Sequence, residues 1–284
     1  MVTEAMEALN VRLGGSYVDC TLGAGGHARA ILERVGASGR VLGIDADLAA
    51  LDLAAGALGG FGTAAVLVQA NFSELSRVCA EHGFSANDGI LFDLGISSMQ
   101  IETAARGFSF QREAPLDMRF DTTAGPSAAD IVNTYSEREI ARILWEYGEE
   151  RRSRQIAHRI VEQRPILSTL RLADIVLQVL GSRRGKIHPA TRTFMALRIA
   201  VNRELDSLKL ALEQAVVLLR SGGRLVVISY HSLEDRIVKQ FMRAEAAEHA
   251  LSLITRKVIR PTSEELRSNP RSRSARLRVA ERLA

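Results

Sequence analysis

Short apolar runs alternate with helical patterns over the first ninety residues, and this alternation constrains the fold more than any other feature. A strand, helix, strand order of this kind predicts a parallel sheet with helices on both faces. The expected strands are Ser16–Cys20, Arg40–Asp45, Ala65–Gln69 and Asp88–Asp93, and the expected helices between them are Ala28–Val35, Leu48–Leu58 and Ser73–His82.

The strand pattern stops near residue 101 and resumes only at Arg224–Ser229, after the turn signal Ser221-Gly222-Gly223. A crossover between parallel strands normally needs little more than one helix. We therefore predict an α/β, Rossmann-like domain formed by residues 1–101 and 201–284, with an all-helical insertion at 102–200. The helices expected in and after the insertion are Glu137–Tyr147, Arg151–Gln163, Leu170–Leu180 and one long helix, Thr191–Arg220. Two β-rich stretches are expected in the tail, Leu253–Arg260 and Ala275–Glu281.

Length and composition agree with a globular protein. The chain has 284 residues, 46% of them hydrophobic, which is enough for a full core and an insertion. No signal peptide is expected, and the apolar runs are shorter than the roughly 20 residues that cross a bilayer. The two cysteines, Cys20 and Cys79, suggest neither a disulfide framework nor a metal site. We expect a cytoplasmic protein without a membrane partner, and the sequence leaves a homodimer open.

Charge is distributed unevenly along the chain. The formal net charge is +4, yet residues 1–150 carry 10 basic and 21 acidic residues. Residues 151–203 carry 12 basic residues, among them Arg183, Arg184 and Lys186, against 2 acidic ones, and residues 256–284 carry 9 against 3. This asymmetry favours a polyanionic partner such as RNA, although a basic face that is merely solvated remains an alternative.

A glycine-rich loop follows the first expected strand. It reads Gly23-Ala24-Gly25-Gly26-His27, and glycine at a strand-to-helix turn lets a ligand approach the backbone closely. The second strand ends in Asp45, whose carboxylate can accept both hydroxyls of a ribose. The pattern predicts a cofactor that contains adenosine; the alternative is an ordinary tight turn.

The loop alone leaves the cofactor open, because Gly23-x-Gly25-x-x-Ala28 also satisfies the dinucleotide pattern. A nicotinamide-dependent oxidoreductase is thus the main rival, and a non-catalytic RNA-binding assembly factor is a third hypothesis. Three features favour S-adenosylmethionine. Asp93 ends the fourth strand, where a carboxylate can meet the methionine amino group; the sheet is expected to close with Ala275–Glu281; and basic surfaces suit a nucleic-acid substrate.

Eight motifs in order resemble the RsmH (MraW) family of bacterial 16S rRNA methyltransferases, and the resemblance runs essentially end to end. The chain differs from the family pattern at its start, where His-x-Pro-Val is usual, and at Met99, where proline is common. The motifs begin at Asp19, Asp93, Arg106, Pro115, Tyr147, His188, Ser229 and Asn269, and they read DxTxGxGGH, DLGISSxQ, RGFSF, PLDMR, YGEE, HPATRTF, SYHSLEDR and NPRSRS.

The resemblance implies a Rossmann-like class I methyltransferase sheet that transfers a methyl group from S-adenosylmethionine to N4 of cytosine-1402 in 16S rRNA of the small ribosomal subunit. Together with its basic charge, it leads us to expect that the helical insertion at 102–200 is an RNA-recognition domain. It also implies roles for individual residues. The cofactor would be held by the loop, by Asp45 at the ribose, by Phe72 beside the adenine, and by two further side chains after the fourth strand. The implied cofactor residues are Gly25, Gly26, His27, Asp45, Phe72, Asp93 and Gln100.

The proton acceptor is less constrained. The cytosine amine is a poor nucleophile, so an acceptor near its hydrogens would help. His231 and Ser232, after the strand at Arg224–Ser229, are the catalytic candidates, because ligands bind at the carboxyl ends of strands in such sheets. A structural histidine that caps the following helix is an equal alternative for His231.

Several residues are candidates for RNA contact. His188 and Arg192 open a helix and could seat a phosphate, whereas Arg271 and Arg273 lie in a basic loop that could instead be solvated. The aromatic residues of the insertion are expected in its core, with stacking on an extruded base as the alternative. These aromatic residues are Phe108, Phe110, Trp145 and Tyr147.

Overall fold

The computed structural model describes residues 1–181 and 188–284. The chain forms two compact units, Met1–Gly95 with Leu205–Ala284, and Ile96–Glu204. The predicted edges of the insertion were 102 and 200. Arg183, Arg184 and Lys186 of the basic stretch lie outside the described residues. Within the described ranges, no helix has the length and apolar character needed to cross a membrane.

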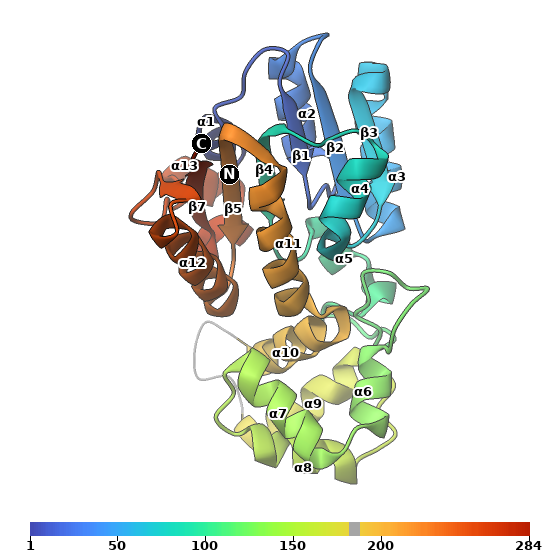
Figure 1. Ribbon diagram of the computed structural model, residues 1–284. Helices are drawn as coiled ribbons and strands as arrows, with labels where there is room; N and C mark the ends of the chain where they lie inside the picture. Colours follow the sequence, from blue (N-terminus) through green and yellow to red (C-terminus); the bar gives the residue numbers. More distant parts are fainter. Residues whose placement is uncertain (182–187) are drawn as a thin grey trace. The chain divides into compact units, whose positions relative to one another are not determined.

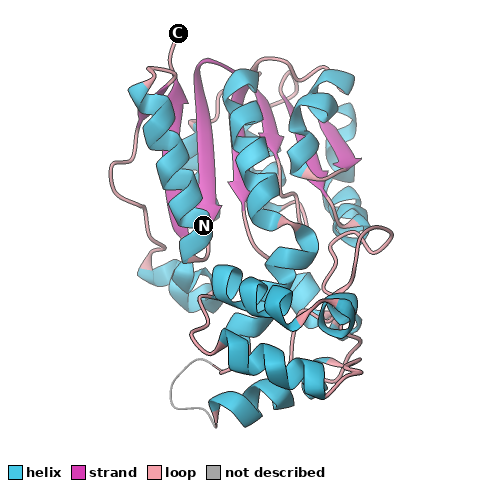
Figure 2. Cartoon of the chain, turned by 60° about the horizontal axis from the view of Figure 1, so that its bottom comes forward, coloured by secondary structure: helices cyan, strands magenta, loops and turns pink. Residues whose placement is uncertain are grey.

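The first unit is built on a sheet of seven strands, counted over the described residues (Figures 1 and 2). Its strand order is β3-β2-β1-β4-β5-β7-β6; the neighbours from β3 to β5 are parallel, and β7 runs antiparallel to both β5 and β6. This arrangement confirms the predicted Rossmann-like sheet. The strands are β1 (Ser16–Asp19), β2 (Arg40–Asp45), β3 (Ala65–Gln69), β4 (Asn87–Asp93), β5 (Leu219–Ser229), β6 (Leu251–Leu253) and β7 (Arg276–Arg282).

Alternate residues of the strands enter different hydrophobic clusters, as the two-residue period of a strand requires. Val18 of β1 packs with α4, α11 and α12, whereas its neighbour Tyr17 packs with α1, α2 and α3. The sheet is therefore covered on both faces. The helices of this unit are α1 (Val2–Leu9), α2 (Gly26–Val35), α3 (Leu48–Leu58), α4 (Leu75–Glu81), α11 (Glu204–Leu218), α12 (Ser232–Ala247) and α13 (Ser263–Ser268), with 3-10 turns η1 (Gly59–Ala64), η2 (Phe72–Glu74) and η4 (Pro270–Ser274).

The second unit is helical and has its own buried cluster. Polar caps define where its helices begin: Ser127 and Asp130 form a capping box on α6, and Ser136 and Glu139 form one on α7. Such boxes satisfy backbone N–H groups that have no partner inside the helix. Its helices are α5 (Ser98–Glu102), α6 (Ala128–Thr134), α7 (Glu137–Gly148), α8 (Ser153–Glu162), α9 (Thr169–Leu180) and α10 (Thr191–Asn202), with the 3-10 turn η3 (Ala104–Arg106).

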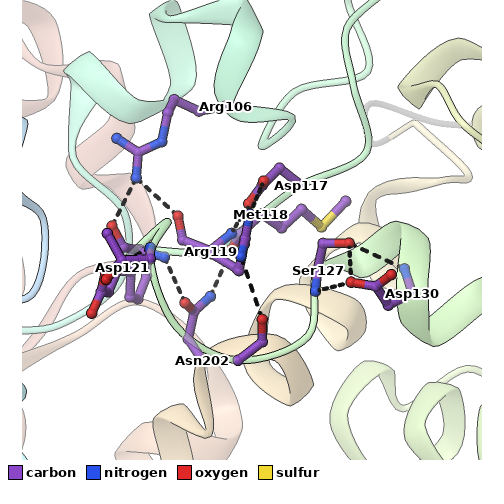
Figure 3. Close-up of polar contacts among 11 residues, drawn as sticks. Arg106, Asp117, Met118, Arg119, Asp121, Ser127, Asp130 and Asn202 are labelled. Atoms are coloured by element: carbon purple, nitrogen blue, oxygen red, sulfur yellow. Dashed lines mark hydrogen bonds and ion pairs between the residues drawn. The ribbon is translucent and has the colours of Figure 1, made fainter.

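A polar network fixes the irregular segment before α6 (Figure 3). Arg106 donates to the carbonyl oxygens of Arg119 and Phe120, at 2.8 and 2.9 Å. Asn202 donates to the carbonyl of Met118 and accepts from the Phe120 N–H, at 2.8 and 2.7 Å. These bonds hold Met118, which is buried and has a φ of 65°, in a left-handed conformation that a methionine rarely adopts.

Three details differ from the sequence predictions. The long helix expected over Thr191–Arg220 is two helices, α10 and α11, separated by Arg203 with a φ of 50°. The strand β5 begins at Leu219, so the segment expected to be a turn lies in an irregular part of that strand. The β-rich stretch expected at Leu253–Arg260 is only the end of β6 and one isolated bridge at Ile259.

Replacement of Gly107 by alanine should destabilise the second unit strongly. Gly107 has a φ of 71°, and a Cβ would lie 2.8 Å from the Asp117 nitrogen and closer still to the Pro115 carbonyl oxygen. Gly125 is the matched control, because its φ is 75° but a Cβ there meets nothing within 4 Å. We expect G125A to cost about 1–2 kcal/mol and G107A about 1–3 kcal/mol more. Equal losses in denaturant unfolding would contradict the contact argument.

Candidate functional site

The loop between β1 and α2 leaves room beside its backbone. Gly25 is the N-cap of α2 and has a φ of 83°, a conformation that glycine adopts without strain. A Cβ on Gly26, the first residue of the helix, would meet nothing within 4 Å. A ligand can therefore approach the start of α2 at this point.

Hydrogen bonds tie this loop to the neighbouring strands. The Gly23 N–H donates to Asp45 Oδ2 at 2.8 Å, which connects the loop to the end of β2. The Asp93 N–H donates to Thr21 Oγ1 at 2.6 Å, which connects the loop to the end of β4. Asp45 Oδ1 also accepts from the Asp47 N–H at 2.9 Å. The loop is thus positioned by groups at the carboxyl ends of three adjacent parallel strands.

Three carboxylates gather at this edge. Asp19 is fully buried; its Oδ1 accepts from the Thr21 N–H at 3.2 Å, and its Oδ2 has no hydrogen-bond partner among the described residues. Asp93 Oδ1 accepts from the Tyr230 hydroxyl at 2.9 Å, and Asp93 Oδ2 lies 3.6 Å from His27 Nδ1. The buried His27 Nε2 is likewise without a partner in the described part of the chain. Two buried polar atoms thus remain available to a ligand.

Burial raises the pKa of each of these carboxyl groups. The pKa of Asp19 is raised to about 6, mainly by burial and further by the charges of Asp93 and Asp45, while His27 opposes the shift. Burial also raises the pKa of Asp93, against the opposing effects of His27 and Tyr230. The site is therefore an acidic one in which negative charge is poorly solvated, and a cationic ligand would relieve that cost.

Phe72 and Gln100, the remaining cofactor residues implied by the resemblance, lie in different units. Phe72 is half-buried in η2, and its ring meets Phe92 of β4 edge to face, with centroids 5.8 Å apart. Gln100 belongs to the second unit, where it is buried and forms a capping box with Ser97 on α5. The described contacts thus bring the loop, Asp45 and Asp93 together.

His231 caps α12. Its Nδ1 accepts from the Glu234 N–H at 3.4 Å, and its Nε2 lies 3.1 Å from Glu234 Oε1 at an angle that makes no hydrogen bond. Glu234 in turn accepts from the Tyr230 N–H at 2.9 Å. Ser232 is the first residue of this helix. Both nitrogens of His231 therefore face Glu234.

The residues proposed for RNA contact fall on both units. His188 stacks on Phe110, with ring centroids 4.5 Å apart, and its Nδ1 accepts from the Ala190 N–H at 3.2 Å. Arg192 is exposed near the start of α10 and donates to the Glu149 carbonyl at 3.3 Å. Arg271 and Arg273 are exposed in η4 of the first unit.

Three groups that shape the site, Asp19, Thr21 and Tyr230, were not predicted to contact the cofactor; of these, only Tyr230 lay in a segment considered for the proton acceptor. Asp19 and Thr21 stand in the motif before the glycine loop, and a polar pair directly after a buried strand was a usable signal. Tyr230 directly follows β5, so its position at the same edge was predictable. Its hydrogen bond to Asp93 was not, because that contact joins residues 137 positions apart.

Comparison with known proteins gives consistent matches. The family model described as the MraW methylase family matches residues 1–283. A Dehalococcoides mccartyi protein named Ribosomal RNA small subunit methyltransferase H is 53% identical, covering 100% of this chain and 85% of that protein. A Thermomicrobium roseum protein of the same name is 52% identical, covering 100% and 93%.

One solved structure supports the fold. It is the structure of a Clostridium thermocellum protein that is named as a provisionally assigned rRNA methylase. The TM-score is 0.50 at 12% identity, and the match covers 99% of this chain and 93% of that one.

The raised pKa of Asp19 predicts that stability falls as pH rises. Because its pKa is about 6 in the folded state and near 3.8 in the unfolded state, the folded protein binds more protons between these values. The free energy of unfolding should therefore decrease by about 2–3 kcal/mol between pH 4 and pH 7 through this group. D19N should remove that decrease in denaturant unfolding measured across the pH range.

The substitution Asp117→Asn is a control for which we expect the opposite pH dependence of stability. Burial alone would raise the pKa of Asp117, but hydrogen bonds from Arg119 and its charge outweigh burial and lower it. The stability that Asp117 contributes is present at neutral pH and is lost as pH falls through its folded pKa, so D117N should destabilise at pH 7 and become neutral at low pH. A stability difference between D19N and wild type that does not change with pH would contradict the account of Asp19.

Proposed function

The chain belongs to the MraW methylase family, and from that premise we propose that it methylates N4 of cytosine-1402 in the 16S rRNA of the small ribosomal subunit. The chain is an S-adenosylmethionine-dependent rRNA methyltransferase. The observation that carries the assignment of the site is the acidic edge of β1, β2 and β4 around an open glycine loop. The reaction would take place in the cytoplasm, where the ribosomal substrate is found.

The residues at this edge fit the cofactor. Asp45 can accept the ribose hydroxyls, because each of its oxygens accepts one backbone N–H and keeps a second lone pair. Asp93 would receive the amino group, and the unpartnered Asp19 Oδ2 adds negative charge nearby. Phe72 offers an apolar ring beside the adenine, and the backbone at Gly25, Gly26 and His27 approaches the cofactor. Gln100 of the second unit is proposed to complete the set.

The same charges argue against the nicotinamide rival. A dinucleotide places its pyrophosphate at the start of the first helix of the sheet. Here that helix start adjoins Asp19 and Asp93, whose negative charges act on each other and would repel a phosphate. The antiparallel strand β7 also departs from the parallel dinucleotide-binding sheet.

The bound cofactor supplies an activated methyl group on a sulfonium, so the main task of the protein is to orient the amine for in-line attack and exclude water. The end of β4 and the segment after β5 are the elements that would hold the cytosine. His231 and Ser232 are proposed to contact it there. Since both ring nitrogens of His231 face Glu234, accepting a proton would require the cap of α12 to loosen.

Methyl transfer from labelled S-adenosylmethionine to small subunits from a strain that lacks the enzyme tests the proposal. We expect one methyl group, which mass spectrometry of nuclease fragments places on N4 of cytosine-1402, and no incorporation when that base is uracil. Absence of transfer by folded protein that binds the cofactor would overturn it. The variants D45A and D93A should abolish methylation. If the wild-type protein binds RNA but does not methylate it, the result would support the alternative hypothesis of a non-catalytic RNA-binding assembly factor.

Gly26→Ala should weaken cofactor binding without harming the fold. Its Cβ meets no protein atom within 4 Å, and alanine is the better helix former. Gly56→Ala in the exposed face of α3 is the matched control, because its Cβ also meets nothing within 4 Å. Calorimetry should show weaker S-adenosylmethionine binding for G26A alone, with neither variant less stable than wild type. Equal affinity in both variants would argue against a cofactor at the start of α2.

His231→Asn separates capping from chemistry. Asparagine is a strong N-cap, so H231N should keep the melting temperature, whereas H231A should lose about 1 kcal/mol of stability. Single-turnover methyl transfer then reports the other role. A stable H231N that is inactive supports contact with the cytosine, and one that is fully active assigns His231 to the cap alone.

A further inference from the structure

A basic groove lies on the second unit, and none of the residues proposed above for the cofactor, for catalysis or for phosphate contact lines it. It has a volume of about 910 Å³ and is lined by α7 and by the start of α8. Six of its lining residues carry the argument: Arg138, Arg142, Trp145, Arg151, Arg152 and Arg154.

The groove is built from one stripe of α7 and the segment that leads into α8. Arg138, Arg142 and Trp145 are spaced four and three positions apart, so they lie on the same face of the helix. The other face of α7 carries Ile140, Ile143 and Leu144, which are buried in the core of the unit. The stripe is therefore not needed to hold the helix in place.

Three of the five guanidinium groups have no partner in the described part of the chain. Arg142 pairs with Glu146 at 2.7 Å, and Arg152 donates to the Val179 carbonyl at 2.8 Å. Arg138, Arg151 and Arg154 are exposed, and no hydrogen bond or ion pair joins them to the described residues. The acidic lining residue, Glu137, lies 3.1 Å from His158. The groove thus presents positive charge that the unit itself does not neutralise.

Trp145 is exposed in this groove, against the sequence prediction that it would lie in the core. Its exposed fraction is 58%, whereas Phe108 is buried at 8%. A large aromatic face among unpaired arginines suits one class of partner well. Single-stranded nucleic acids are bound by aromatic side chains that stack on bases and by positive charges that follow the phosphates. An acidic peptide would use the arginines but would have no specific need for the indole.

We propose that the groove between α7 and α8 binds a single-stranded segment of the substrate RNA, with Trp145 stacked on one base and Arg138, Arg151 and Arg154 on the phosphates. The inference rests on the proposed function, because it takes the substrate to be rRNA. It adds a recognition site on the helical unit that is built entirely from residues of α7 and the α8 start. The residues of the cofactor site play no part in it.

Tryptophan fluorescence tests the stacking directly, because Trp145 is the chain's one tryptophan. Titration of the full chain with a single-stranded RNA oligonucleotide should quench its emission. Inorganic polyphosphate provides the charge without bases, and we expect it to bind with little quenching. Equal quenching by both would overturn base stacking.

Two sets of variants test the groove against a matched control. W145A should weaken binding of 16S rRNA roughly 5- to 100-fold, and W145F should retain most of it, since stacking contributes that much per base. The triple variant R138Q/R151Q/R154Q should lower the slope of log affinity against log salt by about 2, as expected for three single-strand phosphate contacts. The control R171Q/R243Q/R256Q removes the same charge from exposed positions elsewhere and should leave the slope nearly unchanged.

The readouts separate failure of this inference from failure of the proposed function. If wild type methylates rRNA and the groove variants bind it as tightly as wild type does, the groove inference is wrong and the proposed function stands. If wild type binds S-adenosylmethionine but never methylates rRNA, the proposed function fails first. Loss of binding to intact small subunits alone, with naked 16S rRNA bound normally, would assign the groove to a ribosomal protein and overturn the RNA assignment.

Discussion

Two hydrogen bonds, each from a backbone N–H to a side-chain oxygen, hold the glycine loop after β1, and the rest of the site depends on them. The Gly23 N–H donates to Asp45, and the Asp93 N–H donates to Thr21, so the loop after β1 is joined to the ends of both neighbouring strands. The Asp45 carboxylate holds the loop and is also proposed to contact the ribose, whereas Asp93 holds the loop through its N–H and is proposed to contact the amino group through its carboxylate. The same two residues therefore set the positions of the loop and of the ligand. A change at Asp45 would therefore alter the loop as well as the contact to the ribose. Preorganisation of this kind reduces the entropy that binding must overcome.

The acidity of the site follows from the sheet itself. Parallel strands end at one edge, so aspartates that terminate β1, β2 and β4 are brought together although they are far apart in sequence. Burial makes their charges costly, and a cationic sulfonium compound would offset that cost. Methyl transfer removes the positive charge from the cofactor, so the product gains less from these carboxylates than the substrate does. The same electrostatics that favour binding thus favour release after reaction.

Sequence patterns predicted the elements whose stability is local and missed those decided by tertiary contacts. The strands ending in Asp45 and Asp93 were predictable, because buried parallel strands read as short apolar runs. The break at Arg203 was not, since a left-handed arginine carries no helix-stopping signal of its own. Trp145 was expected in the core, yet its helix already buries another face. The proposed cofactor residues follow from sequence motifs, whereas the Tyr230 contact with Asp93 required the fold.

The chain separates two opposite electrostatic tasks between its parts. The donor is a small cation, and the carboxylates that suit it would repel the phosphates of an RNA substrate. Exposed arginines suit the phosphates, but beside the cofactor they would weaken its binding. A helical insertion lets basic groups be placed on a separate unit with its own core, so each surface keeps the charge its ligand requires. In the sequence, residues 1–95 of the first unit carry 5 basic and 11 acidic residues. In the helical unit the basic excess is confined to residues 151–203, with 12 basic and 2 acidic residues, whereas residues 96–150 carry 5 and 10.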